Sequence, residues 1–291
     1  MNNRYINYQH HIDSHGGVEK MTLVQANIAD NGNSIILLAD RQLTMQLSPD
    51  LSPYEFEAKT PKIFFHENVG MGFAGSGLYA DVAASKISDK KDFDEIASTI
   101  TTYISETRKD IIEKTIKRLT GVDSDMFFQN PNLPIPLDIR GMIYSEIREL
   151  KLCHCIIAGF DKKSKARMII TDDVGDQIEA TNFSVVSIGS GSPFSQVYFD
   201  QYGYDCKMST KEAILFAFEA KRWAQSHTGV GETTDMLVFV KDKKDIKVKE
   251  IFDNSTLMKK LKDTYQAEME NKKIVRDNLI EKMFKGEDGI C

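Results

Sequence analysis

The chain has 291 residues, and its 37 Lys and Arg are outnumbered by 43 Asp and Glu, which gives a formal net charge of -6. A mildly acidic chain lacks the positive field that recruits nucleic acid or anionic lipid, so we expect neither as a partner. Four cysteines are too few and too irregularly spaced for a disulfide framework in a chain that can fill its own core. No apolar run approaches the ~20 residues of a membrane helix. Composition therefore predicts a cytoplasmic globular protein.

Residues 1–21 are polar and lack the apolar centre of a signal peptide. We expect them to be a disordered head, a propeptide or a mis-assigned start. Met21 directly precedes Thr22, and initiation at Met21 followed by removal of the methionine would expose Thr22. An N-terminal threonine has both a nucleophilic hydroxyl and a free α-amine, so this residue could form a catalytic unit by itself.

Two hairpins are predicted in the first quarter of the chain. The apolar runs 23–29 and 34–39 flank an Asn-Gly pair, which favours a tight turn between antiparallel strands. The second run is apolar almost throughout, so we expect it to be buried on both faces, with Asp40 and Arg41 at its end. Residues 45–60 are interpreted as a loop. Runs 62–65 and 69–75 predict the second hairpin.

The middle of the chain alternates helices and strands. A helix is predicted from Gly77 to about Lys86, and Asp92 with Glu95 forms a capping-box pattern at the start of a long one. The proline-rich stretch 120–138 is interpreted as an insertion loop, either a lid or docking segment or a plain packed insertion, and a short helix follows to about Leu150. Strands are expected at three ranges: 153–159, 166–171 and 183–188.

A Cys-His-Cys triplet opens the first of these strands, at Cys153, His154 and Cys155. Because side chains alternate along a strand, the two cysteines face one way and the histidine the other. The three cannot converge on one ion, so no metal site is expected.

The last third of the chain has the same pattern. Gly189-Ser190-Gly191 turns the chain into a helix near Phe194, and Ser209 with Glu212 predicts a second capping box. Residues 235–240 form a buried strand, residues 246–251 alternate like an edge strand, and the charged tail has a helical pattern. We divide the chain into a head at 1–21, one domain at 22–252, and a helical tail at 253–291.

The order of these elements indicates an α+β protein. Strands, two helices, strands, two helices and strands are buried most simply in a four-layer αββα sandwich, with an extra C-terminal helix. Several short motifs occur in order along this pattern: Thr22 at a strand start, Ala39-Asp40-Arg41, Lys62-Ile63-Phe64, the run 70–75, the run 188–194 and Asp235-Met236-Leu237-Val238. The ordered set resembles a proteasome β subunit, of the N-terminal nucleophile (Ntn) hydrolase superfamily, over roughly residues 22–250.

The resemblance implies a threonine-type peptidase that hydrolyses peptide bonds through an acyl-enzyme on Thr22. It implies that Asp40 and Lys62 form an ion pair beside the threonine, that Ser190 contacts the α-amine, and that the N–H of Gly75 forms the oxyanion hole. It also implies that Thr44 pairs with an extended substrate, and that the side-chain pocket lies near Leu43, Ile63 and Met71. No cofactor or metal is implied. The chain departs from the family at Gln42, where an arginine is usual, and in residues 226–231 before the last core strand.

The partners implied are a peptide or unfolded protein as substrate, further copies in a homo-oligomer or proteasome-like ring, and an ATPase. Two alternatives stay open from the sequence. One is an acyl-transferring peptide ligase similar to the connectases, which use the same N-terminal residue. The other is a non-catalytic structural subunit in which residues 1–21 block the threonine.

Overall fold

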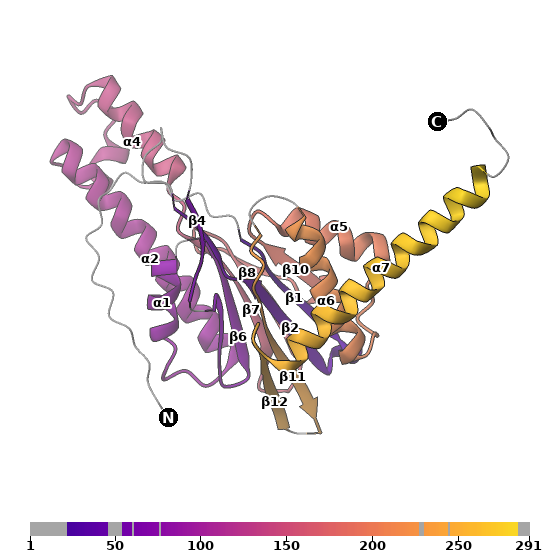
Figure 1. The fold of residues 1–291 in the computed structure, drawn as a ribbon. Coiled ribbons are helices and arrows are strands. Elements are labelled where there is room, and N and C mark those ends of the chain that lie inside the picture. The colour runs from indigo at the N-terminus through magenta and orange to yellow at the C-terminus, as the bar shows by residue number, and fades with distance from the viewer. Residues whose placement is uncertain are drawn as a thin grey trace.

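Two five-stranded antiparallel sheets form the centre of the protein (Figure 1). The computed structural model describes residues 22–45, 54–59, 61–75, 77–226, 230–243 and 245–284. The first sheet has the order β10-β1-β2-β11-β12, and the second β5-β6-β7-β8-β9. The first comprises β10 (Val185–Ile188), β1 (Val24–Ala29), β2 (Ser34–Asp40), β11 (Thr234–Asp242) and β12 (Asp245–Ile251). The second comprises β5 (Ile63–His66), β6 (Val69–Gly75), β7 (Cys153–Phe160), β8 (Ala166–Thr171) and β9 (Gln177–Glu179).

Helices cover the outer face of each sheet. In Figure 1, α1 and α2 lie on one side of the sheets and α5 and α6 on the other. The helices are α1 (Gly77–Ser85), α2 (Phe93–Thr120), α3 (Ser124–Gln129), α4 (Leu137–Glu149), α5 (Ser192–Tyr202), α6 (Thr210–Gln225) and α7 (Thr256–Phe284). Three buried clusters separate the four layers: one between the sheets, one beneath α1 and α2, and one beneath α6 and α7. The predicted four-layer sandwich is confirmed.

The two sheets approach closely because glycines face the partner sheet. A Cβ at Gly72 would lie 2.4 Å from Cγ1 of Val24, and one at Gly70 would lie 2.8 Å from the ring of Phe239. Real Cβ atoms do not come this near, so β6 needs glycine where β1 and β11 cross it. The close packing fixes the position of β5 and β6 relative to the strands that carry Thr22 and Asp40.

Both hairpins are confirmed, and one turn differs in detail from the prediction. β1 and β2 pair antiparallel from Val24 opposite Ala39 to Ala29 opposite Ser34. The connection is a 3-10 turn in which Asp30, as well as Asn31 and Gly32, has a positive φ. β2 is buried along its whole length, as its apolar sequence predicts.

Three strands were not predicted, β3 (Gln42–Met45), β4 (Tyr54–Glu57) and β9. Residues 45–60 were interpreted as a loop, but β4 pairs with β3 in a small separate sheet. Aromatic and acidic residues alternate in β4, but over only four positions, and the preceding Pro53 favoured the interpretation as a loop. β9 has three exposed residues, which is too short for periodicity to identify.

The insertion at 120–138 is a packed helical segment rather than only a loop. Gly121 ends α2 in the left-handed conformation, and α3 and α4 then fold back against α2. Phe127 of α3 is buried with Ile116 of α2 and Ile143 of α4 in a small cluster of their own. The plain packed insertion is the alternative that agrees with these contacts, although Phe128 remains half exposed.

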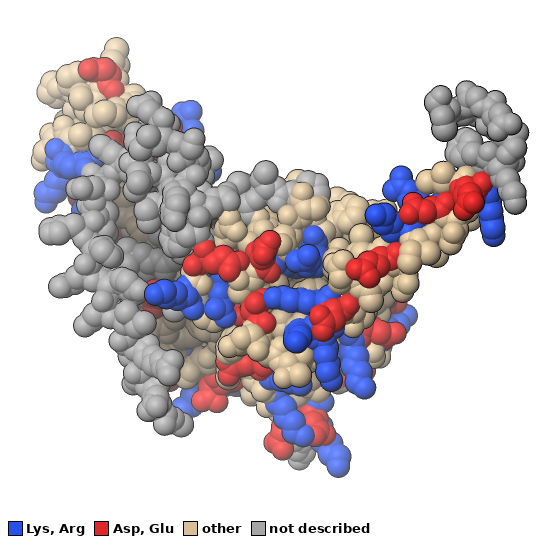
Figure 2. Space-filling model, viewed as in Figure 1, with Lys and Arg blue, Asp and Glu red and all other residues tan. Residues whose placement is uncertain are grey.

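The predicted helical tail is present as α7. Its first half packs Met258 and Leu261 on the body, and its second half projects away from it in Figure 1. Charges of both signs alternate along α7 and across the adjoining face (Figure 2). Among the described residues, no helix is long and apolar enough to cross a membrane.

Candidate active site

Thr22 lies at the point where β1 begins, and its side chain meets those of Asp40 and Lys62. The residue is 2% exposed. Its Oγ1 donates a hydrogen bond of 2.8 Å to Oδ1 of Asp40 and accepts one from Nζ of Lys62. The antiparallel pairing of β1 with β2 explains the first contact, because it returns the end of β2 to the start of β1. The hydroxyl therefore lies between a carboxylate and an ammonium group.

Asp40 is a fully buried carboxylate that accepts hydrogen bonds on both oxygens. Oδ1 accepts from Thr22 Oγ1 at 2.8 Å, Leu23 N at 3.1 Å and Lys62 Nζ at 2.8 Å, and Oδ2 from Gln42 N at 3.3 Å and Gly231 N at 2.8 Å. Backbone donors from three segments fix its orientation. A buried carboxylate is stable only when its lone pairs are satisfied in this way.

Lys62 uses its three donors on three acceptors around the threonine. Its Nζ donates to Oγ1 of Thr22, to Oδ1 of Asp40 and to the carbonyl of Gln42. Burial lowers the pKa of Lys62 below its usual value, and the attraction of Asp40 only partly opposes this. A lysine with a lowered pKa gives up a proton more readily than a free one.

Ser190 approaches Thr22 from the turn between β10 and α5. Its hydroxyl accepts a hydrogen bond of 3.2 Å from the backbone N of Thr22, and the N–H of Gly191 donates to the Thr22 carbonyl at 3.2 Å. In a chain that begins at Thr22, this nitrogen would be the α-amine. The turn therefore binds both backbone groups of the threonine.

Gly75 ends β6 with a φ of +118°, a conformation that favours glycine. The N–H of Phe73, two residues earlier, bonds the carbonyl of Lys62 at 3.2 Å. This pairing places the end of β6 beside the start of β5, which Lys62 directly precedes. Among the described residues, no hydrogen bond joins Gly75 to Thr22.

The residues expected around the substrate lie in two places. Leu43 and Thr44 are in β3, where Thr44 pairs with Glu55 of β4, and their side chains lie outside the described part of the structure. Ile63 is 3% exposed between the sheets, and Met71 is fully buried beneath α1 and α2. Both side chains are buried, and their place beside a substrate stays a prediction.

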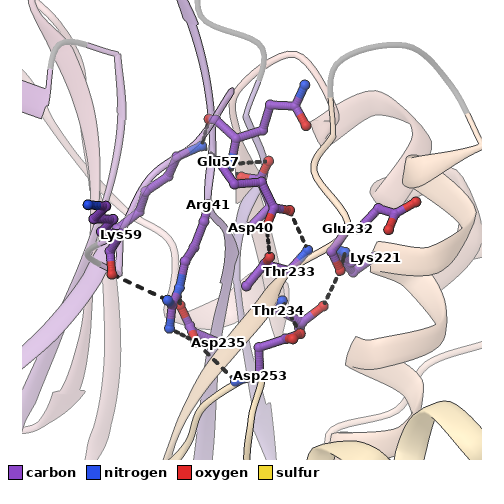
Figure 3. Close-up of polar contacts among 12 residues, drawn as sticks. Asp40, Arg41, Glu57, Lys59, Lys221, Glu232, Thr233, Thr234, Asp235 and Asp253 are labelled. Carbon is purple, nitrogen blue, oxygen red and sulfur yellow. Dashed lines mark hydrogen bonds and ion pairs between the residues drawn. The ribbon is translucent and has the colours of Figure 1, made fainter. Parts of the chain in front are cut away.

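Sequence reasoning missed two contributors to the site. Gly231, which precedes β11, donates its N–H to Asp40. Lys221 of α6 is fully buried and donates to the carbonyl of Glu232 at 2.8 Å (Figure 3). A lysine one turn after Ala217 and next to Ala220, on the apolar side of a helix, is a signal that could have identified it.

A second ion pair lies next to the site. Arg41 binds Asp235 through two nitrogen atoms, at 2.5 and 2.7 Å, and Asp235 also accepts the N–H of Asp253 at 3.3 Å (Figure 3). Thr233 donates its N–H to Glu57 at 2.8 Å. These contacts join the start of β11 to β2 and β4, and so stabilise the strand ends that carry the site.

The cysteine and histidine side chains lie as the strand period predicts. Cys153 and Cys155 are buried and His154 is exposed. Within the described ranges, no group of three or more histidine, cysteine or acidic side chains could hold a metal ion.

Comparisons with known proteins found similarity to one family and to solved structures. The family model for the proteasome subunit matches residues 132–237. Among solved structures, the chain is similar to a Gly-1 mutant of Anbu from Hyphomicrobium sp. strain MC1, with a TM-score of 0.54 and 15% identity over 86% of this chain and 95% of that one. No curated protein matches. Over residues 132–237 the chain is thus similar to the proteasome subunit family, and its four-layer αββα fold is similar to that of Anbu.

Proposed function

We propose that the protein is an N-terminal threonine peptidase that hydrolyses peptide bonds through an acyl-enzyme on Thr22. The observation that carries the proposal is the contact of the Thr22 hydroxyl with both Asp40, at 2.8 Å, and Lys62. The site is buried and its carboxylate is fully hydrogen-bonded. A hydroxyl in these surroundings is positioned for attack on a carbonyl carbon.

The base in the proposed reaction is the α-amine of Thr22, freed by removal of Met21. Its reference pKa of about 7.7–8.0 is closer to neutrality than that of a lysine at about 10.4. The amine takes the hydroxyl proton as Oγ1 bonds to the substrate carbonyl, and it passes that proton to the leaving amine. Lys62 donates to Oγ1 and so stabilises negative charge on it. Ser190 accepts from the amine and orients it.

The intermediate carries its negative charge on the former carbonyl oxygen. We assign the N–H of Gly75 as the donor to this oxygen, a contribution of about 2.7–4 kcal/mol per donor in other acyl-transfer enzymes. Water then attacks the acyl group on Thr22 and releases the second product. An extended peptide would lie along β3 at Thr44. We propose that the reaction takes place in the cytoplasm.

The test compares the wild type with Thr22→Ala and Thr22→Ser on a fluorogenic peptide library. N-terminal mass spectrometry of each sample establishes whether the chain begins at Thr22. We expect no cleavage by Thr22→Ala and residual cleavage by Thr22→Ser, which keeps a hydroxyl. Equal cleavage by the wild type and Thr22→Ala would refute the mechanism.

A peptide ligase uses the same acyl-enzyme and transfers the acyl group to another amine. The two functions are separated by adding a competing peptide with a free N-terminus to the assay. Hydrolysis without a joined product supports the peptidase. A non-catalytic subunit would retain residues that precede Thr22 and would cleave nothing.

We also propose that the protein forms a homo-oligomer through the second half of α7. Beyond the part of α7 that packs Met258 and Leu261 on the body, and beyond the ion pair of Lys272 with Glu268, the residues Val275 and Leu279 are exposed. In the proposed homo-oligomer, the exposed half of α7 packs on the body of a second copy of the chain. The variant Val275→Glu/Leu279→Glu should lower the molar mass measured by light scattering, and an unchanged mass would argue against this interface.

A further inference from the structure

A buried lysine behind the site contacts the segment that orients Asp40. Lys221 comes from α6, and it is 0% exposed. Its Nζ donates to the carbonyl of Glu232 at 2.8 Å and to Oε1 of Gln225 at 3.1 Å. Figure 3 shows Lys221 and Glu232 beside Asp40. Both acceptors are uncharged, which is uncommon for a buried ammonium group.

The carbonyl of Glu232 that accepts from Lys221 belongs to a short segment, and the residues on either side of Glu232 donate hydrogen bonds as well. We call residues 230–233 the β11 entry segment. Its Gly231 N–H donates to Oδ2 of Asp40 at 2.8 Å, and its Thr233 N–H donates to Oε1 of Glu57 at 2.8 Å. A Cβ at Gly231 would lie 2.8 Å from Cβ of Gln42, so the segment lies tightly against the chain after Asp40.

We propose that Lys221 is a positioning residue for the threonine site: by fixing the carbonyl of Glu232, it fixes the Gly231 N–H that orients Asp40 toward Thr22. The inference goes beyond the proposed peptidase function, and only its kinetic part rests on that function. The geometry of the contact stands without it.

The charged groups around Lys221 determine its protonation, and its shortest hydrogen bond is the one to the carbonyl of Glu232. The charged groups around it are Asp40 on β2, Asp253 after β12, Arg222 on α6 and Lys262 on α7. Burial and the two cations together outweigh the two carboxylates, and they lower the pKa of Lys221 to about 7. Burying such a group costs free energy, and its hydrogen bond to the carbonyl of Glu232 offsets part of that cost.

The experiment measures amide exchange and kinetics in the full-length chain. Lys221→Met removes the donor and retains the apolar stem. Lys241→Met is the matched control, because Lys241 also donates to a backbone carbonyl, that of Ser164 at 2.9 Å, but far along β11 from the site. We expect the β11 entry segment in Lys221→Met to lose amide protection, and the control to retain it.

The kinetic readout separates positioning from a general loss of structure. We expect kcat to fall by about 10–100-fold in Lys221→Met while KM changes by less than about threefold, because a misplaced catalytic group affects the transition state more than substrate binding. Lys241→Met should keep both constants. If Lys221→Met does not fold, Lys221→Gln, which is too short to reach the carbonyl, replaces it.

Two outcomes would overturn the inference: unchanged protection of the β11 entry segment in the folded variant, or lost protection with unchanged kcat. If the wild type cleaves no peptide, the peptidase proposal fails. The exchange result then still decides whether Lys221 fixes the segment.

Discussion

Gly189 lies directly against Thr22: a Cβ on Gly189 would come within 2.1 Å of the Thr22 carbonyl oxygen and 2.7 Å of its Cγ2. The glycine also has a φ of +92°, in the left-handed region. The turn that carries Ser190 can therefore reach the threonine only with a residue that lacks a side chain at this position.

The first prediction follows from this contact. Gly189→Ala should lower activity at least about 10-fold, because the new methyl group displaces Thr22 from Asp40. Gly203→Ala is the control, since Gly203 also has a positive φ, of +68°, but a Cβ there meets nothing within 4 Å. Both variants should lose about 1 kcal/mol of unfolding free energy from the backbone conformation. An equal loss of activity in both would refute the specific effect.

The second prediction concerns the buried carboxylate. The side-chain amide of Asp40→Asn has one acceptor oxygen where the carboxylate has two. Some of the groups that donate to Asp40 therefore lose their acceptor, and Lys62 loses its counter-ion. We expect the free energy of unfolding to fall by about 3–5 kcal/mol in urea titrations. Asp94→Asn removes an ion pair with Arg167 at an aspartate whose side chain is 74% exposed, and should cost less than about 1 kcal/mol. Similar losses in both variants would contradict the assignment.

The third prediction tests the close approach of the sheets. Gly72→Ala places a methyl group 2.4 Å from Cγ1 of Val24, and should destabilise the protein by about 1–3 kcal/mol. Gly141→Ala in α4 meets nothing within 4 Å and should stabilise the helix by about 0.5–1 kcal/mol. Thermal unfolding of the two variants should thus shift in opposite directions. A stabilised Gly72→Ala would show that the sheets can separate freely.

The fourth prediction concerns pH. Burial and neighbouring cations lower the pKa of Lys221 from its usual 10.5 to about 7. Between these values the folded protein binds fewer protons than the unfolded chain, so the free energy of unfolding rises with pH. The stability present above pH 10.5 is lost as the pH falls through about 7.

The measurement is urea unfolding of the wild type and Lys221→Met at several pH values from 7 to 9. The stability of the wild type relative to the variant should rise by up to about 1.4 kcal/mol per pH unit. A difference that stays constant across this range would mean that Lys221 titrates near its usual value.

The main elements of the site could be predicted because short motifs along the chain occur in an order that resembles a proteasome β subunit. Thr22, Asp40 and Lys62 lie at strand ends, and Ser190 lies in a glycine turn between a strand and a helix. Each signal is weak alone, and their order along the chain made them specific. The structure brings these four residues together.

The remaining contacts depend on distant packing that short patterns do not encode. Gly231 contacts Asp40 across 191 positions of sequence, and the contact depends on the register of β11 beside β2. Lys221 sits one turn after Ala217, where an apolar residue is expected, and only the position of Glu232 explains it. The strands β3, β4 and β9 were missed because three or four residues carry too little periodicity.

The hydrogen bonds of Thr22 reach across most of the chain. Its backbone nitrogen bonds a residue 168 positions later, and Asp40 needs an N–H from a residue 191 positions after itself. The contacts around Thr22 and Asp40 therefore cannot all form during synthesis until residue 231 has left the ribosome.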